Sequence, residues 1–305
     1  MSDFRNLGQS VSNWGRWGSD DEKGTLNLIT PECVLRATSL VQDGKVYSLA
    51  IPFDEDGPQD GRVRSNPQHS MLQTGHEVGK YPGAVCVADD QVEMALQASS
   101  QWDSLSHVFY DGQLYNGFDA DTVTERGAVH CSVAALNPGV VSHGVLLDVA
   151  RWAGVPWLEK GTPITPEDLT AVAEHQGVTI HPGAVVLVRT GWRARYLSDG
   201  DSAAFKSGEP GLTMECATWF HERDVAALAC DNYAVEVLPG VVEGEFLPFH
   251  MVAIRDMGMP LSEILDMEEL AEDCARDQRY EFMFCGAPLP FTHGVGSPVN
   301  PLVMR

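Results

Sequence analysis

Basic residues are scarce in this sequence. It has 20 lysines and arginines against 43 aspartates and glutamates, which gives a formal net charge of −23. Nucleic-acid backbones and anionic lipid surfaces would repel such a chain at long range. We therefore expect no nucleic acid and no membrane among its partners, although the same acidity is also an ordinary means of keeping a protein soluble.

Long apolar runs are absent as well. No run approaches the roughly 20 residues that a membrane helix needs, and the first residues have neither the basic start nor the apolar core of a secretory signal. The sequence also contains no GxGxxG or P-loop motif, which argues against a nucleotide cofactor. The lack of a membrane helix and of a secretory signal predicts a cytoplasmic protein.

Closely spaced cysteine pairs are missing too. The seven cysteines are an odd number and none forms a CxxC motif, so neither a disulfide framework nor a structural zinc site is supported. Cys230 follows several apolar residues, which favours a buried, unreactive thiol over a nucleophile. We therefore expect the thiols to be reduced and mostly buried.

What the sequence does contain is typical of one folded domain. It has 305 residues, of which 44% are apolar and 21% charged, enough for a sizeable core. Caps and apolar patterns predict helices and strands as follows: helices at residues 31–44, 166–177 and from 266 onward, and strands at 45–52, 178–180 and 184–189. This alternation predicts a single α/β domain over residues 1–305, with residues 1–28 as a candidate N-terminal arm.

Two segments are too rich in turn-forming residues for regular structure. Residues 54–66 are polar and predict a long surface loop, and residues 288–301 are rich in proline and glycine. His69 and His76 lie near the first of these segments. They either line the mouth of a pocket or, as is more common for histidines beside glycines, lie on the surface.

One segment carries polar residues at a regular spacing. These residues are all separated by even numbers of positions: Gln97, Gln101, Asp103 and His107. In an extended chain they would share one face. Amide, carboxylate and imidazole groups on one face can hold a divalent cation, or can hold a water molecule and move its proton. An ordinary solvated strand face has the same spacing, so both interpretations remain open at this point.

The same segment is similar to the HxGTHxDxxxH signature of the cyclase family, which includes bacterial kynurenine formamidases and isatin hydrolases. Gln97 and Gln101 stand at the two histidine positions that precede the aspartate of this signature. Asp103 matches the aspartate and His107 the final histidine. The motif is therefore altered to QxxxQxDxxxH.

The resemblance extends over nearly the whole chain. The family has a downstream histidine followed about a dozen residues later by a glutamate, and His250 and Glu263 match this pair. Similar segments also occur at residues 14–18 and 296–301. The resemblance implies a swivelling β/β/α cyclase-like fold, a single domain with a mixed sheet and surrounding helices. It also implies a homo-oligomer, commonly a dimer.

A metal site is implied by the same resemblance. Its ligands would be Gln101, Asp103, His250 and Glu263. Glutamine is a weaker ligand than imidazole, which favours one divalent ion, Mn²⁺ or Zn²⁺, over two zinc ions. Such an ion lowers the pKa of water from about 15.7 to about 7. Asp103 and His107 would be the catalytic residues, with His107 moving the proton; in the alternative, no metal binds and the cluster only orients a substrate.

Several residues near the motif and farther along the chain are candidates for binding a substrate: Gln97, Trp102, Phe109, Tyr110, Asp231 and Asn232. Aromatic residues beside a polar site commonly form walls for a flat ligand, although core packing explains them equally well. The Asp231–Asn232 pair follows an apolar run, and polar residues at the end of a buried strand often reach a site.

Three functions fit these features. The first is a metal-dependent hydrolase that cleaves a C–N or C–O bond in a small cyclic or aryl amide or lactone. The second keeps the fold but closes a ring, as a cyclase or dehydratase of secondary metabolism, because one fold hosts several reactions. The third is a non-catalytic protein that binds a small molecule at a site altered by the two glutamines.

Overall fold

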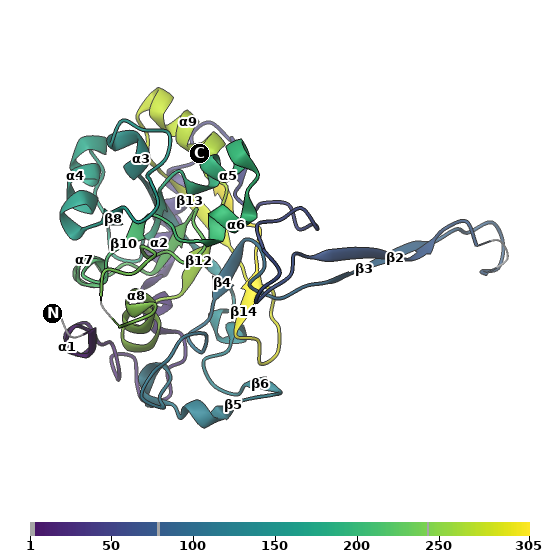
Figure 1. The fold of residues 1–305 in the computed structure, drawn as a ribbon, viewed down its shortest axis with the longest axis horizontal. Helices are drawn as coiled ribbons and strands as arrows, with labels where there is room; N and C mark the ends of the chain where they lie inside the picture. Colours follow the sequence, from purple (N-terminus) through teal and green to yellow (C-terminus); the bar gives the residue numbers. More distant parts are fainter. Residues whose placement is uncertain (1–3, 78–79, 243) are drawn as a thin grey trace.

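A nine-stranded mixed sheet forms the centre of the molecule (Figure 1). The computed structural model describes residues 4–77, 80–242 and 244–305. From one edge to the other, the strands follow the order β1 (Val46–Ser48), β15 (Leu302–Met304), β13 (Glu281–Gly286), β7 (Val140–Asp148), β9 (Val185–Arg189), β11 (Ala227–Cys230), β12 (Leu261–Glu263), β4 (Gln101–Asp103) and β14 (Gly296–Pro298).

The middle of this sheet is parallel and its flanks are antiparallel. Strands β7, β9, β11 and β12 run parallel, whereas β4 pairs antiparallel with both β12 and β14. Strand β9 is buried along its whole length, as its apolar sequence predicts for a strand covered on both faces. Val186 and Val188 enter one hydrophobic core, and Val185 and Leu187 enter the other.

Helices surround the sheet and supply the other halves of the two cores. Their bounds are α1 Phe4–Ser10, α2 Pro31–Ser39, α3 Val149–Trp152, α4 Pro166–Gln176, α5 Trp192–Asp199, α6 Ser202–Lys206, α7 Cys216–Glu222, α8 Pro248–His250 and α9 Glu268–Asp277. Shorter helical turns are η1 Gly24–Leu28, η2 Tyr115–Gly117, η3 Ala120–Thr122, η4 Val133–Leu136 and the π-helical η5 Met251–Asp256.

Local sequence patterns account for several of these elements. Helix α4 begins with a capping box between Thr165 and Asp168 and ends at Gly177, whose left-handed φ of 67° suits a residue without a side chain. The predicted helix at residues 266 onward is α9. Helix α2 ends at Ser39, earlier than the predicted residue 44.

Two predictions of local structure were wrong. Residues 178–180 form no strand, because this segment is the connection between the end of α4 and β9. Conversely, the segment 288–301 contains β14, which pairs with β4 at the edge of the sheet. Proline is tolerated there because an edge strand does not need every backbone N–H for pairing.

A long hairpin projects from the body (Figure 1). Its strands β2 (Gln68–Thr74) and β3 (Ala88–Glu93) pair only with each other within the described chain. His69 lies on this hairpin, where its imidazole contacts the exposed Asp90 at 2.9 Å. Two further small sheets pair β8 (Pro163–Ile164) with β10 (Gly211–Leu212), and β5 (Val123–Thr124) with β6 (Gly127–Ala128).

The described part of the N-terminal segment lies against its own chain. The indole N–H of Trp14 donates to the carbonyl of Arg255 at 2.7 Å, and the Thr25 hydroxyl donates to the carbonyl of Ala226, also at 2.7 Å.

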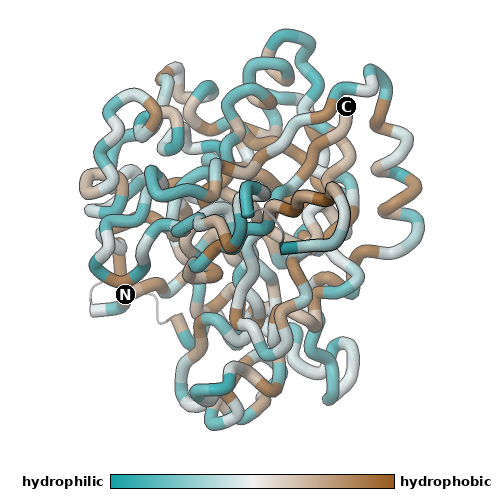
Figure 2. Tube along the Cα trace, turned by 90° about the vertical axis from the view of Figure 1, so that its right-hand side faces the viewer, coloured by the Kyte–Doolittle hydropathy of each residue, from teal (hydrophilic) through white to brown (hydrophobic). Residues whose placement is uncertain are grey.

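In Figure 2 the loops at the top and bottom of the body are largely hydrophilic. Within the described ranges, no helix is both long and apolar enough to cross a membrane.

Candidate functional site

Strand β4 brings two residues of the motif onto one face of the sheet. Gln101 lies opposite Glu263 in the antiparallel pairing with β12, and Asp103 lies two residues along on the same face. The even-spacing prediction therefore holds for Gln101 and Asp103. It does not hold for the whole segment, because β4 is only three residues long, and Gln97 and His107 lie in the loops on either side of it.

Helix α8 places His250 against these side chains. The helix begins at Pro248, after Leu247 has turned the chain through a left-handed φ of 59°. His250 Nε2 lies 3.1 Å from Glu263 Oε1. Asp103, His250 and Glu263 are all buried, and each offers one ligand atom within 4.8 Å of the others. Sequence-distant residues thus form a compact donor set of one imidazole and two carboxylates.

The amide of Gln101 completes this cluster. Its Nε2 donates to Glu263 Oε2 at 2.8 Å and to Asp103 Oδ1 at 3.3 Å. Two buried oxygens remain without a hydrogen-bond partner in the structure, Gln101 Oε1 and Asp103 Oδ2. Buried polar atoms are nearly always paired, so these two oxygens indicate a site built for a further group.

Glu236 fixes the orientation of the imidazole. His250 Nδ1 lies 2.7 Å from Glu236 Oε1, and the same carboxylate accepts the backbone N–H groups of Phe249 and His250. A carboxylate behind a ligating histidine is the usual support of a metal-binding imidazole. Sequence reasoning missed Glu236. The available indication was an acid within the otherwise apolar run at residues 234–238, which predicts a buried charge with a specific partner.

The charges of the cluster are strongly coupled. Burial would by itself lower the pKa of His250, but Glu236 and Glu263 outweigh burial and raise it to about 10. Burial, together with the charge of Asp103, raises the pKa of Glu263 to about 7. The site in this form therefore retains a proton on His250, and a cation would have to displace that proton.

His107 lies at the edge of the cluster. Its Nε2 is 3.7 Å from Asp103 Oδ1, beyond hydrogen-bond distance but close enough for an electrostatic interaction. Burial lowers the pKa of His107, and this outweighs the opposite effect of the Asp103 charge. The imidazole is therefore neutral near pH 7 and able to accept a proton.

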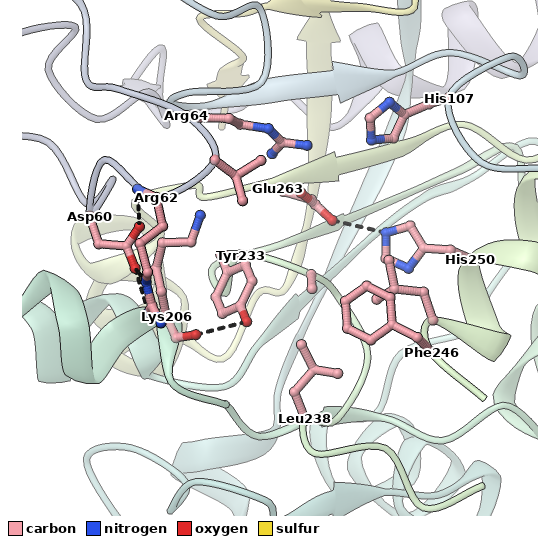
Figure 3. Close-up of a pocket in the computed structure, with 13 residues that line it drawn as sticks. Asp60, Arg62, Arg64, His107, Lys206, Tyr233, Leu238, Phe246, His250 and Glu263 are labelled. Atoms are coloured by element: carbon pink, nitrogen blue, oxygen red, sulfur yellow. Dashed lines mark hydrogen bonds and ion pairs between the residues drawn. The ribbon is translucent and has the colours of Figure 1, made fainter. Parts of the chain in front are cut away.

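A cavity of about 400 Å³ opens beside these residues (Figure 3). Its lining includes both histidines and Glu263 as well as Tyr233, Leu238 and Phe246. The loop at residues 54–66, which we predicted to be a surface loop, also contributes to the wall with Asp60, Arg62, Val63 and Arg64. The cavity is therefore partly apolar and partly basic.

Three aromatic candidates lie outside this cavity, which corrects the prediction. Trp102 is fully buried on the opposite face of β4, and its indole N–H donates to the carbonyl of Gly286 at 2.9 Å. Tyr110 donates its hydroxyl to Asp256 at 2.8 Å. Phe109 is partly exposed and does not line the cavity either. Tyr233 and Phe246 are the aromatic residues that do.

Asp231 and Asn232 are buried structural residues beside the cavity rather than part of its lining. The Asp231 carboxylate accepts the backbone N–H groups of Thr190 and Gly191, at 2.9 and 2.7 Å. The amide of Asn232 donates to the carbonyl of Pro210 at 2.8 Å. The prediction that this strand end approaches the site was useful, because the next residue, Tyr233, reaches the cavity.

Gln97 lies behind Asp103. Its Nε2 is buried without a partner and occupies the space over Gly296, where a β-carbon would come within 2.4 Å of it. Gly296 is the direct neighbour of Asp103 across the β4–β14 pairing. Gln97 is thus close to the metal-ligand candidates but does not line the cavity.

Comparison with a family model and with solved structures gives matches that agree with each other. A family model described as “Putative cyclase” matches residues 33–237. A crystal structure of a novel cyclase has 36% sequence identity and a TM-score of 0.91, and the match covers 98% of this chain and 99% of the other. A search of curated proteins gives no match.

Two more distant structures share the fold. Isatin hydrolase A from Labrenzia aggregata, bound to benzyl benzoate, has 18% identity and a TM-score of 0.63, over 88% of this chain and 94% of that one. A predicted metal-dependent hydrolase from Bacillus stearothermophilus has 17% identity and a TM-score of 0.57, over 86% and 98% of the two chains. The mixed sheet with its surrounding helices is common to them.

Proposed function

Because this chain belongs to the cyclase family and has its α/β fold, we propose that it is a metal-dependent hydrolase. Its substrate is a small cyclic or aryl amide or lactone, in which it cleaves a C–N or C–O bond. One observation carries the proposal: the buried donor atoms of Asp103, His250 and Glu263 lie within 4.8 Å of one another, and His107 Nε2 is 3.7 Å from Asp103 Oδ1.

The residues fit one divalent ion. Asp103 Oδ2 is buried and free to bind, and Glu236 holds the His250 ring so that Nε2 points into the cluster. Rotation of the Gln101 amide would bring its unpaired oxygen toward the same point. Three oxygen donors and one nitrogen suit Mn²⁺ or Zn²⁺. A bound divalent ion would polarise the carbonyl under attack and lower the pKa of water.

The remaining chemistry belongs to side chains of the cavity. His107 is neutral near pH 7, so it accepts the proton of the attacking water and then delivers it to the leaving amine or alcohol. Asp103 stands next to it and stabilises the positively charged imidazole that results. Tyr233 and Phe246 form apolar walls against which a flat substrate packs.

The test uses purified protein analysed for metal content and assayed against panels of aryl amides, cyclic amides and lactones. We expect turnover that chelation removes and that Mn²⁺ or Zn²⁺ restores. His107→Gln should lose at least ~100-fold in kcat while it retains its metal, because general acid–base groups contribute about 10²- to 10⁴-fold. Glu222→Gln, a substitution of an exposed side chain, is the matched control. Full activity in verified metal-free protein would refute the metal-dependent mechanism.

A second candidate function is supported by the Gln101 amide, whose Nε2 donates to the carboxylates of both Glu263 and Asp103. In that case the enzyme closes a ring as a cyclase or dehydratase. Reaction in ¹⁸O-labelled water separates the two functions, because hydrolysis must leave label in the product and ring closure with loss of water does not.

We also propose that the protein acts as a homodimer on a small-molecule substrate and is cytoplasmic. Support for the dimer comes from the family resemblance, and support for the location comes from the acidic composition and the lack of long apolar runs.

A further inference from the structure

One wall of the cavity is basic. Figure 3 shows Arg62, Arg64 and Lys206 on one side of the cavity, with His250 on the other. In a chain with more than twice as many acidic as basic residues, this cavity is lined by these three cations and by two carboxylates, Asp60 and Glu263. Their partners decide whether this wall has a free positive charge.

Arg62 has no free charge to offer. Its Nε donates to the Asp60 carboxylate at 2.6 Å, and both residues come from the same loop. This pair is neutral as a unit and contributes shape rather than net charge to the wall.

Arg64 and Lys206 are held by neutral groups instead. Arg64 Nη1 donates to the backbone carbonyl of Gln97 at 3.1 Å, and Lys206 Nζ donates to the Gln59 side-chain oxygen at 2.8 Å. Gln59 is itself fixed, because its Nε2 donates to the carbonyl of Ala98 at 2.7 Å. Among the described residues no carboxylate hydrogen-bonds to either cation, and the charges of Asp60 and Glu263 act on Lys206 only from beyond contact distance.

The two cations affect each other. Burial and then the positive charge of Arg64 lower the pKa of Lys206, and together they outweigh the carboxylates of Asp60 and Glu263, which raise it. Glu263 makes its hydrogen bonds to His250 and Gln101 and not to either cation, although the charge of Arg64 lowers its pKa. An anion between Arg64 and Lys206 would relieve their repulsion and make charge-assisted hydrogen bonds with both.

We propose that the substrate is an anion and that its carboxylate binds between Arg64 and Lys206. Anion binding is inferred from the residues of the cavity alone. The placement of the scissile bond toward His107 rests on the proposed hydrolase function. A cavity of about 400 Å³ suits a compound of about one ring with a short acidic arm. The Tyr233 ring, 5.2 Å from Lys206 Nζ, would border the apolar part of such a ligand.

Binding of matched acids and amides tests this proposal without any turnover. The probes are benzoate, phenylacetate and hippurate, each paired with its neutral primary amide, and dissociation constants are measured by titration calorimetry at fixed ionic strength. Chelator-treated protein is used, so that a carboxylate cannot bind to a metal instead. At least one acid should bind about tenfold or more tightly than its amide. Added salt should weaken binding of the acid and leave binding of the amide unchanged.

The variants Arg64→Gln and Lys206→Gln should each weaken binding of that acid by roughly tenfold and leave amide binding within about twofold. Lys206→Arg retains the charge and should retain most of the affinity, which separates charge from packing. Arg126→Gln, which removes one positive charge from an exposed position outside the cavity lining, is the control and should change little. Circular dichroism of each variant checks folding.

Two results would overturn the proposal. One is that none of the acids binds more tightly than its amide. The other is that binding of the acid and binding of the amide weaken by the same factor in the Lys206→Gln and Arg64→Gln proteins. If the protein prefers acids to amides but hydrolyses none of the amides and lactones, the anion site is supported and the proposed hydrolase function is wrong. The two failures are therefore distinguishable.

Discussion

His250 and Glu236 form a buried pair in which imidazole Nδ1 lies 2.7 Å from a carboxylate oxygen. The carboxylate also accepts two backbone N–H groups in α8, so its position does not depend on the imidazole alone. The pair therefore decides which nitrogen of His250 is available to a ligand. The two residues are 14 positions apart in the sequence.

Substitution of this carboxylate should weaken metal binding. In Glu236→Gln the amide oxygen can still accept from Nδ1, but the negative charge that makes the imidazole a good donor is lost. We expect Mn²⁺ and Zn²⁺ affinity to fall by about 10- to 100-fold. Competition with a chromogenic chelator measures this. Unchanged affinity in a folded Glu236→Gln protein would contradict the assigned role.

Restoring the motif histidines should change the number of ions. The double variant Gln97→His/Gln101→His supplies two imidazoles beside Asp103, and imidazole is a better zinc ligand than an amide. We expect zinc content to rise from one to two ions per chain, measured by mass spectrometry of the metal. Gln91→His on the exposed β3 strand is the control. A double variant that still binds a single ion would show that the glutamines do not limit occupancy.

Trp102 should matter for stability and not for metal binding. Its side chain is fully buried on the face of β4 that points away from Asp103. Trp102→Phe loses the hydrogen bond to Gly286 and part of the packed volume, so the free energy of unfolding should fall by about 1–3 kcal/mol. Urea unfolding measures the loss. A large drop in metal affinity at unchanged stability would be the opposite result.

His143 should make stability depend on pH. Burial lowers the pKa of this histidine to about 4 in the folded chain, whereas an unfolded histidine titrates near pH 6.5. The unfolded state then binds more protons between these values, so the free energy of unfolding falls as pH decreases from about 6.5 to about 4. The slope from one such group is at most about 1.4 kcal/mol per pH unit.

The comparison protein is His143→Gln, which has no titrating ring at this position. Urea unfolding at several pH values between 4.5 and 7.5 should show a shallower pH dependence in the variant than in the parent protein. Parallel curves for the two proteins would mean that other groups cause the acid sensitivity.

The oligomeric state can be measured directly. We expect light scattering during size-exclusion chromatography to give twice the mass of the 305-residue chain at micromolar concentration. A mass equal to that of one chain would contradict the homodimer.

Strand alternation explains both a success and an error of the sequence analysis. Gln101 and Asp103 are two residues apart and lie on one face, as predicted. Trp102 lies between them, so the same rule places it on the other face, away from the site. Its assignment as a substrate contact neglected that rule. The strand itself is too short for the alternation to reach Gln97 or His107.

The rest of the site depends on contacts between distant segments. His250 and Glu263 were identified through family resemblance, because spacing along the chain contains no information about a contact between α8 and β4. Lys206 and Arg64 reach the cavity from a helix end and a polar loop, and such residues resemble ordinary surface cations in the sequence. Local caps, by contrast, predicted α4 well because the interactions that form them lie within a few residues.

The projecting hairpin divides the molecule into regions of unequal cooperativity. Strand β3 is exposed along its length, and Gln73 is the one buried residue of β2. Its ladder therefore receives little support from the two cores, and a lone pair of strands is marginally stable in water. Backbone amides of β2 and β3 in the single chain should exchange with deuterium through local opening, while those of β9 exchange only when the whole sheet opens.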